Sequence, residues 1–233
     1  MRRFYIICLL FFILLSQNGF SQERTIDDDR TLETKIADLL NEMPAGTIEE
    51  KDALMEDMIA LGREGIVEFS KLLTPPQTGG DSLVRYALGS VTTYAADGIA
   101  GEHREMVARA LLSSLEDENN TAVKRFLMEQ LEIVGGDEAV PVLAGYLDHP
   151  QLCNRAAMAL VEIGTPKAEK ALGNALESSD KTVLLAVVNA LGELHSTDYL
   201  DEIQSLAREY SGNLRKVLLR ALAGSGSPEA KDV

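Results

Sequence analysis

Three histidines, His103, His149 and His195, are the side chains of this sequence that most readily suggest metal or acid–base chemistry. A shared zinc ion would require its ligands to lie about 2 Å from one point. The three histidines instead fall in three different turns between predicted helices. His103 and His195 are expected on one edge of the molecule, several helices apart, and His149 on the opposite edge. We therefore predict no metal site and no cofactor.

Other short motifs give no catalytic constellation either. The sequence contains no Gly-x-Ser-x-Gly elbow, phosphate loop or dinucleotide fingerprint. The glycine-rich stretch "GSGSPEA" at 224–230 follows a predicted helix, whereas a phosphate loop follows a strand. The triplet 27–29, "DDD", lacks the ligand spacing of a calcium loop. Acidic side chains are scattered along helical faces without a defined acid–base pair, so we predict that this chain is not an enzyme.

The first 21 residues read as an export signal. Arg2 and Arg3 precede a ten-residue apolar run, 6–15, and small residues flank a cleavage position after Ser21. The apolar run is shorter than the roughly 18 residues of a membrane span. The sequence thus predicts a signal peptide at 1–21 and a flexible acidic leader at 22–30. The mature chain is expected in the periplasm or outside the cell, without stable membrane insertion.

The net charge argues against a nucleic-acid partner, and the cysteine content argues against an internal disulfide. The net charge is −15, and removal of residues 1–21 makes it −17 because two arginines and no acid are lost. Such an acidic surface repels phosphate backbones, so a nucleic-acid partner is disfavoured. Cys153 is the one cysteine that the mature chain keeps. It excludes an internal disulfide and is expected to be a buried, inert thiol.

An internal repeat organises the sequence after residue 115. The phrase "ALVEIG" at 159–164 has counterparts 29 residues earlier ("QLEIVG") and 31 and 62 residues later ("ALGELH", "ALAGSG"). Apolar residues four apart precede each phrase, which places them on one face of a helix. The three registers are Val123, Leu152, Val183 and Leu214; Leu127, Ala156, Val187 and Leu218; and Leu131, Leu160, Leu191 and Leu222.

A second apolar helix follows each of the first three phrases. Its buried positions are predicted to be Leu143 and Leu147, Leu172 and Leu176, and Ile203 and Ala207. Glycine, proline, threonine and aspartate lie between the two helices, and the turns "EDENNT", "LDHPQ" and "SSDKT" supply caps for the next pair. Hairpins of about 30 residues that bury their faces against neighbours make an α-solenoid. We predict an all-α solenoid of stacked antiparallel helical hairpins over 31–233, with an amphipathic first helix at 32–43.

The stretches "AAMALVEIGTPKAEKALGNALES" and "AVKRFLMEQLEIVG" resemble HEAT repeats, in particular the short phycobilisome-lyase-like type of secreted bacterial proteins. The resemblance covers about 115–226 and is less clean before it. It implies a superhelix whose second helices line a concave binding groove. Outward positions of these helices are our candidate site: Arg109, Ser113, Pro141, Gly145, Lys170, Asn174, Asp201 and Ser205. HEAT units often carry the residue pair Val-Arg early in their first helix. Val123-Lys124 and Leu214-Arg215 match this pair, whereas Leu152-Cys153 and Val183-Leu184 do not.

Two functions remain open at this point. The first is an exported interaction scaffold, without catalytic activity, that binds a protein or peptide partner. The second is an amino-terminal accessory module of a larger secreted carbohydrate-processing enzyme, since arrays resembling this one can precede a sugar-handling domain. The last repeat reads as incomplete, so the helix containing Leu218 is expected to be weakly supported. The pigment-lyase activity of the namesake suits a cytoplasmic protein and is disfavoured here. Insertions at 74–82 and 94–103 are further surface features.

Overall fold

A computed structural model describes residues 29–76, 78–97 and 101–224. The chain divides into two units, Met1–Thr31 and Leu32–Val233, and all described helices belong to the second. The predicted signal peptide 1–21, most of the predicted leader 22–30 and the end of the predicted last repeat, 225–233, lie outside the described residues.

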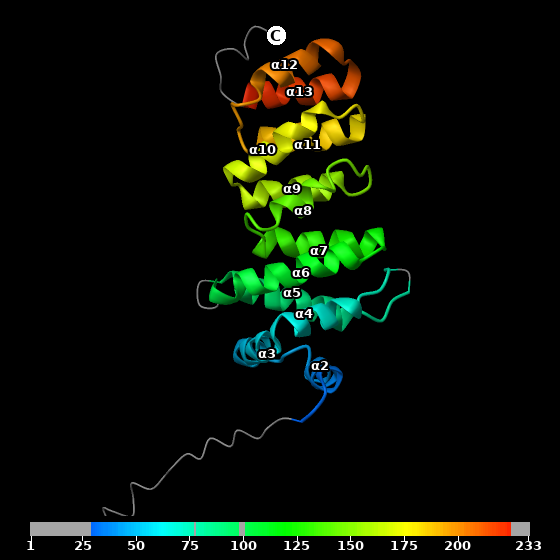
Figure 1. The fold of residues 1–233 in the computed structure, drawn as a ribbon, viewed down its shortest axis with the longest axis vertical. Coiled ribbons are helices and arrows are strands. Elements are labelled where there is room, and N and C mark those ends of the chain that lie inside the picture. The colour runs from blue at the N-terminus through cyan, green and yellow to red at the C-terminus, as the bar shows by residue number, and fades with distance from the viewer. Residues whose placement is uncertain (1–28, 77, 98–100, 225–233) are drawn as a thin grey trace, which may run out of the picture. The chain divides into compact units, whose positions relative to one another are not determined.

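All regular secondary structure in the described part of Leu32–Val233 is helical, with no strand, as the repeat predicted (Figure 1). The α-helices in order are α2 (Leu32–Asn41), α3 (Ile48–Ala60), α4 (Gly62–Lys71), α5 (Ser82–Ala96), α6 (Arg104–Asp117), α7 (Thr121–Val134), α8 (Val140–Ala144), α9 (Cys153–Ile163), α10 (Pro166–Asn174), α11 (Lys181–Glu193), α12 (Leu200–Glu209) and α13 (Gly212–Gly224). Two short 3-10 turns, η1 (Gly101–His103) and η2 (Ala175–Glu177), precede α6 and follow α10.

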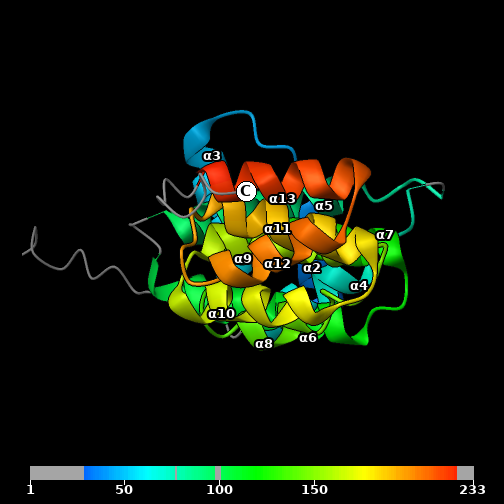
Figure 2. The ribbon, with the colours of Figure 1, turned by 90° about the horizontal axis from the view of Figure 1, so that it is seen from above.

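The helices of this unit form two layers. In the first layer α3, α5, α7, α9, α11 and α13 each contact the next member. The second helices of the hairpins form the other layer, in which α4 contacts α6 and α8 contacts α10. Viewed from above, α6, α8 and α10 gather on one side, opposite α3, α5 and α13 (Figure 2). The predicted α-solenoid of antiparallel hairpins is therefore confirmed.

The predicted core registers are buried throughout. All twelve first-helix positions are at most 4% exposed, and the six second-helix positions are at most 6% exposed. They belong to one continuous core of mostly Leu, Ala, Val and Ile. At roughly 25 cal/mol per Å² of apolar surface, this burial is the main term that holds the layers together. The four-residue spacing of the sequence therefore identified the inner face of each helix correctly.

The turns of the hairpins use the predicted capping residues in most repeats. Gly164 ends α9 with φ of 60°, a left-handed conformation that favours glycine, and the hydroxyl of Thr165 accepts a hydrogen bond from the amide of Ala168 in α10. Asn120 and Asp180 cap α7 and α11 in the same way. The turn "LDHPQ" differs, because Leu152 precedes α9 without a side-chain cap.

The second helix of the third hairpin is shorter than expected. α8 has only five residues, and Leu147, predicted on this helix, lies in the turn that follows it. The amides of Tyr146 and Leu147 bond the carbonyls three residues earlier, which is the tighter 3-10 pattern. Leu147 is nevertheless 3% exposed, so it fills the core as predicted although the helix has ended.

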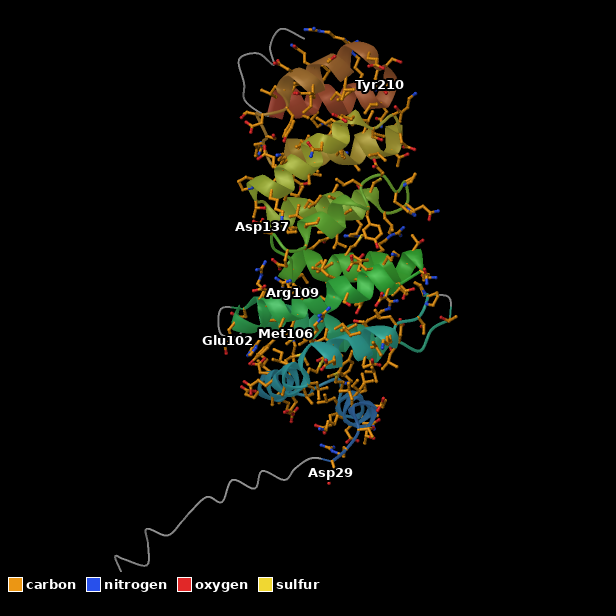
Figure 3. All side chains as sticks on the ribbon, in the orientation of Figure 1. Asp29, Glu102, Met106, Arg109, Asp137 and Tyr210 are labelled. Carbon is orange, nitrogen blue, oxygen red and sulfur yellow. The ribbon has the colours of Figure 1, made fainter. Side chains whose placement is uncertain are left out.

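Polar contacts join successive hairpin turns along one edge of the stack. The carboxylate of Asp137, labelled in Figure 3, accepts a hydrogen bond of 2.6 Å from Thr165, and its carbonyl accepts one of 2.8 Å from Lys167. Each bond links residues about one repeat apart. Equivalent links are Arg104 to the carbonyl of Gly135, Ser196 to the carboxylate of Glu169, and the ring Nδ1 of His195 with the carbonyl of Gly224 at 3.1 Å. These contacts fix the register between neighbouring repeats.

The last described helix, α13, packs against the two helices before it. α13 contacts α11 and α12, and Leu218 is 0% exposed. Leu218 is therefore a core residue in this structure, and the expectation that its helix is weakly supported stays a prediction about stability.

Candidate interaction face

The eight candidate residues lie on or directly after the second helices α6, α8, α10 and α12. Seven of the eight are exposed, and Ser113 on α6 is half-buried because it faces partly into the stack. Gly145 is the residue that ends α8. Arg109, labelled in Figure 3, is paired with Glu105 one turn earlier at 2.6 Å. We call the surface formed by these eight residues the second-helix face.

Two of these candidates meet in one pocket. Asn174 at the end of α10 and Ser205 on α12 line a pocket of about 340 Å³ between the last two hairpins. Its other lining residues are Gly173, Leu176, Glu177, Tyr199, Glu202 and Leu206. This volume lies near the lower end of the roughly 300–1,000 Å³ that ligand pockets usually have. The remaining six candidates are spread along the face and do not converge.

One wall of this pocket is the ring of Tyr199, which lies directly on Gly173. A Cβ atom at position 173 would lie 2.0 Å from Cζ of that ring, so only glycine permits this approach. Tyr199 immediately precedes α12, and Gly173 lies on α10. The contact therefore joins two repeats. Burial, together with the nearby carboxylates of Glu169, Asp198 and Glu202, raises the pKa of the Tyr199 phenol above its usual value.

The polar side chains of this pocket make no hydrogen bonds or ion pairs with other described residues. Among the described residues, Asn174, Glu177, Tyr199, Glu202 and Ser205 have no side-chain hydrogen bond or ion pair with another residue. Two of them are carboxylates, exposed to solvent on neighbouring helices. Below them lie Leu176, which is 6% exposed, and half-buried Leu206. The pocket thus has an apolar floor, an aromatic wall and a negatively charged rim.

Sequence reasoning missed five lining residues of this pocket: Gly173, Glu177, Tyr199, Glu202 and Leu206. The prediction selected residues two positions before each core leucine, which finds outward-facing positions of a single helix. The pocket forms where two helices from different repeats meet. One signal was available, because Gly173 interrupts a predicted helix interior, where glycine usually reflects close packing.

A second pocket, of about 390 Å³, lies in the first-helix layer between α11 and α13. The two helices approach closely beside it, since a Cβ added at Gly192 would lie 3.3 Å from that of Ala221. Its wall includes Val188 and Val217 together with Asn189, Glu193 and Arg220. None of the sequence-predicted candidates contributes to it.

The histidines lie as far apart as their turns require. His103 ends η1, His149 is in the turn before α9, and His195 follows α11. Over the described residues, no group of three or more His, Cys, Asp or Glu side chains could hold a metal ion. No helix in the described part is long and apolar enough to cross a membrane. Asp27 and Asp28, the glycine-rich segment after Gly224 and the predicted signal lie outside the described residues.

Cys153 is a core residue. It begins α9, is 0% exposed and makes no disulfide. Burial raises the pKa of its thiol above the usual value, so the reactive thiolate is disfavoured. The prediction of a buried cysteine is confirmed.

The insertion at 74–82 is closed at its base. The carboxylate of Asp81, 7% exposed, accepts hydrogen bonds of 2.9 Å from the amide of Thr74 and from Nε of Arg85. The same guanidinium donates to the carbonyl of Thr74 and lies 4.6 Å from the ring centre of Phe126 on α7. This loop is therefore anchored to two helices.

The second insertion, 94–103, is shorter than the sequence indicated. Residues 94–96 are the last residues of α5, and 101–103 form η1. The hydroxyl of Tyr94 donates to Glu56 on α3 at 3.0 Å. Residues 97–100 connect α5 to η1 in the sequence, and 98–100 lie outside the described residues.

Comparison with known proteins finds similarity to one repeat family over part of the chain. Residues 149–223, which include α9 to α13, match the family model of HEAT repeats. No curated protein matches the chain. A matching solved structure is that of an engineered protein, a Northeast Structural Genomics Consortium target, with 18% identity and a TM-score of 0.44, covering 82% of this chain and 96% of that chain. Residues 149–223 are thus similar to HEAT repeats, the family that the sequence of 115–226 resembles.

Proposed function

We propose that this chain is an exported HEAT-repeat scaffold that binds a protein or peptide partner through the second-helix face and has no catalytic activity of its own. The observation that carries the proposal is the row of exposed candidate positions on four consecutive second helices, ending in a pocket with unused polar groups. Repeat arrays present extended surfaces of this kind.

The composition of the face supports a peptide-like partner. Pro141, Gly145, Asn174 and Ser205 are small or uncharged, so a backbone or helix can approach closely. A row of shallow positions supplies shape complementarity, and one pocket supplies an anchor, because a few desolvated residues usually dominate the binding energy of an interface. The acidic character of the chain directs this proposal toward proteins rather than nucleic acids.

Partner capture tests this proposal. The tagged protein is expressed in its host, and proteins retained from the extracytoplasmic fraction are quantified by mass spectrometry. Asn174→Arg places a long charged side chain on the face, and Asn154→Arg makes the same change at an exposed position of α9 in the other layer. We expect one set of partners to be lost with Asn174→Arg and kept with Asn154→Arg. Equal retention by both variants would refute binding through this face.

Export rests on the sequence of residues 1–21 and has its own test. The mature protein isolated from its host should begin near Gln22 in mass spectrometry of the intact chain. A protein that retains Met1 and remains inside the cell would refute this part of the proposal. It would leave the interaction face itself unaffected, because the face does not involve residues before Arg109.

A further inference from the structure

We propose that the pocket between α10 and α12 receives a basic side chain, an arginine or a lysine, of the protein partner. This inference rests on the proposed function, because it assumes that the second-helix face binds a partner. It goes further by stating which chemistry that partner must present at the end of the face.

The shape of the pocket suits a long side chain with an apolar stem. Leu176 and Leu206 form an apolar floor, and the ring of Tyr199 forms a flat wall because Gly173 allows it to lie against α10. Arginine and lysine bury their methylene stems along such surfaces while the charged head remains near water. A volume of about 340 Å³ accommodates one such side chain but not a large cofactor.

The charge at the rim selects a cation. Glu177, in η2 after α10, and Glu202, in the first turn of α12, both line the pocket, so a cationic head group inside it lies in the field of two carboxylates. Neither carboxylate has a basic partner within the described structure. Asp201 adds a further negative charge in the same turn, and the nearest basic residues of the two helices, Lys170 on α10 and Arg208 on α12, do not line the pocket. An arginine head can also stack on the Tyr199 ring.

Other occupants fit less well. A phosphate or carboxylate ligand would face two uncompensated carboxylates. A purely apolar ligand would leave five polar side chains without partners, which costs free energy wherever those groups lose water. A metal ion would find two carboxylates from different helices, and the described residues contain no group of three metal-binding side chains. A cationic side chain uses the floor, the wall and the rim together.

The test uses two small probes of equal shape. N-acetyl-arginine amide carries the charge, and N-acetyl-citrulline amide replaces the guanidinium by a neutral urea group. Each is titrated into isotopically labelled protein, and the amide resonances of Gly173, Leu206 and neighbouring residues are followed by NMR. We expect saturable shifts at these residues, with about five-fold tighter binding of the arginine probe, since two exposed ion pairs contribute modestly. That ratio corresponds to ~1 kcal/mol at 1.4 kcal/mol per factor of ten.

Matched variants assign the preference to the rim. Glu177→Gln with Glu202→Gln keeps side-chain size and removes both charges, and the ratio should fall to about one. Glu162→Gln with Glu209→Gln removes the same charge from exposed positions outside the pocket, and the ratio should remain near five. An unchanged urea midpoint for each variant shows that the fold is intact.

Several outcomes would overturn the inference. They are equal affinity of the two probes, the absence of saturable shifts, shifts that map elsewhere, and a preference that survives Glu177→Gln with Glu202→Gln. The partner-capture experiment separates this failure from failure of the proposed function. A partner lost with Asn174→Arg but kept with Glu177→Gln and Glu202→Gln would support the face and reject the basic side chain.

Discussion

Leu127 and Leu218 occupy the same repeat register at an inner and an outer place of the stack. Leu127 is 1% exposed on α7, which contacts α5, α6 and α9. Leu218 is 0% exposed on α13, whose main contacts are α11 and α12. We predict that Leu127→Ala lowers the stability of the whole array, whereas Leu218→Ala mainly loosens α13. Residue type, register and burial are matched, so the place in the stack is the variable.

The expected magnitude follows from the burial of both side chains. Replacing a buried leucine by alanine costs about 2–5 kcal/mol, and we take ~3 kcal/mol for each site. At α7 this loss weakens contacts on both sides, so it should appear in global unfolding. With a urea slope of about 1–3 kcal/mol per M, the midpoint should fall by about 1–3 M. At α13 the helix can open alone, because each repeat contacts only its neighbours.

The two effects are measured by different methods. Circular dichroism in urea should show a clear midpoint shift for Leu127→Ala and less than half of it for Leu218→Ala. Hydrogen exchange should show α13 amides about 100-fold faster in Leu218→Ala, since ~3 kcal/mol is about two factors of ten. Ile133→Ala, at a 44% exposed position of α7, is the control and should change the midpoint little. Equal midpoint shifts at the two leucines, with exchange rising in all helices together, would refute the reasoning.

Two further predictions concern single contacts. Gly173→Ala should destabilise the fold by about 1–3 kcal/mol, because its Cβ would overlap Tyr199, whereas Gly89→Ala, whose nearest contact would be 3.7 Å away, should stabilise α5 by about 0.5–1 kcal/mol in urea unfolding. Burial opposes ionisation of Asp81, but hydrogen bonds from the backbone and from Arg85 outweigh it and hold the pKa of that carboxyl below its usual value. The ionised carboxylate therefore stabilises the fold above the unfolded-state pKa of about 3.9, and this contribution is lost as pH falls through the lower folded-state pKa. Asp81→Asn should thus lower the urea midpoint at pH 7, and the deficit should shrink as pH falls below about 4; a deficit that is the same at both pH values would refute this account.

The sequence predicted the buried face of each repeated helix because that face obeys a local rule. Residues four apart share one side of a helix, so Leu131, Leu160 and their counterparts could be assigned to the core without coordinates. The length of α8 could not be predicted in the same way. Leu147 has the spacing expected of an α-helix and is buried, but it reaches the core from a 3-10 turn. The spacing of apolar residues does not distinguish an α-helix from such a turn.

The sequence predicted which positions of each single helix face outward on the second-helix face, but not the contacts between helices. Outward positions such as Asn174 and Ser205 follow from the core register of their own helix. The closure of the 74–82 loop by Asp81 and the approach of Tyr199 to Gly173 depend on how one element is placed against another. A single sequence without aligned relatives carries no direct signal for such pairs. The pocket was therefore missed although two of its residues were named.

The links between repeats explain why this pocket depends on two hairpins together. Ser196, in the turn before α12, donates a hydrogen bond to Glu169 on α10. One helical turn further along α10, Tyr199 lies on Gly173. Both contacts set how far α12 stands from α10, and the chemistry of the corresponding edge links differs in every repeat. A period in the sequence reveals a recurring core but not these variable links. The links give each pair of repeats its own spacing, and here that spacing leaves Glu177 and Glu202 facing one pocket.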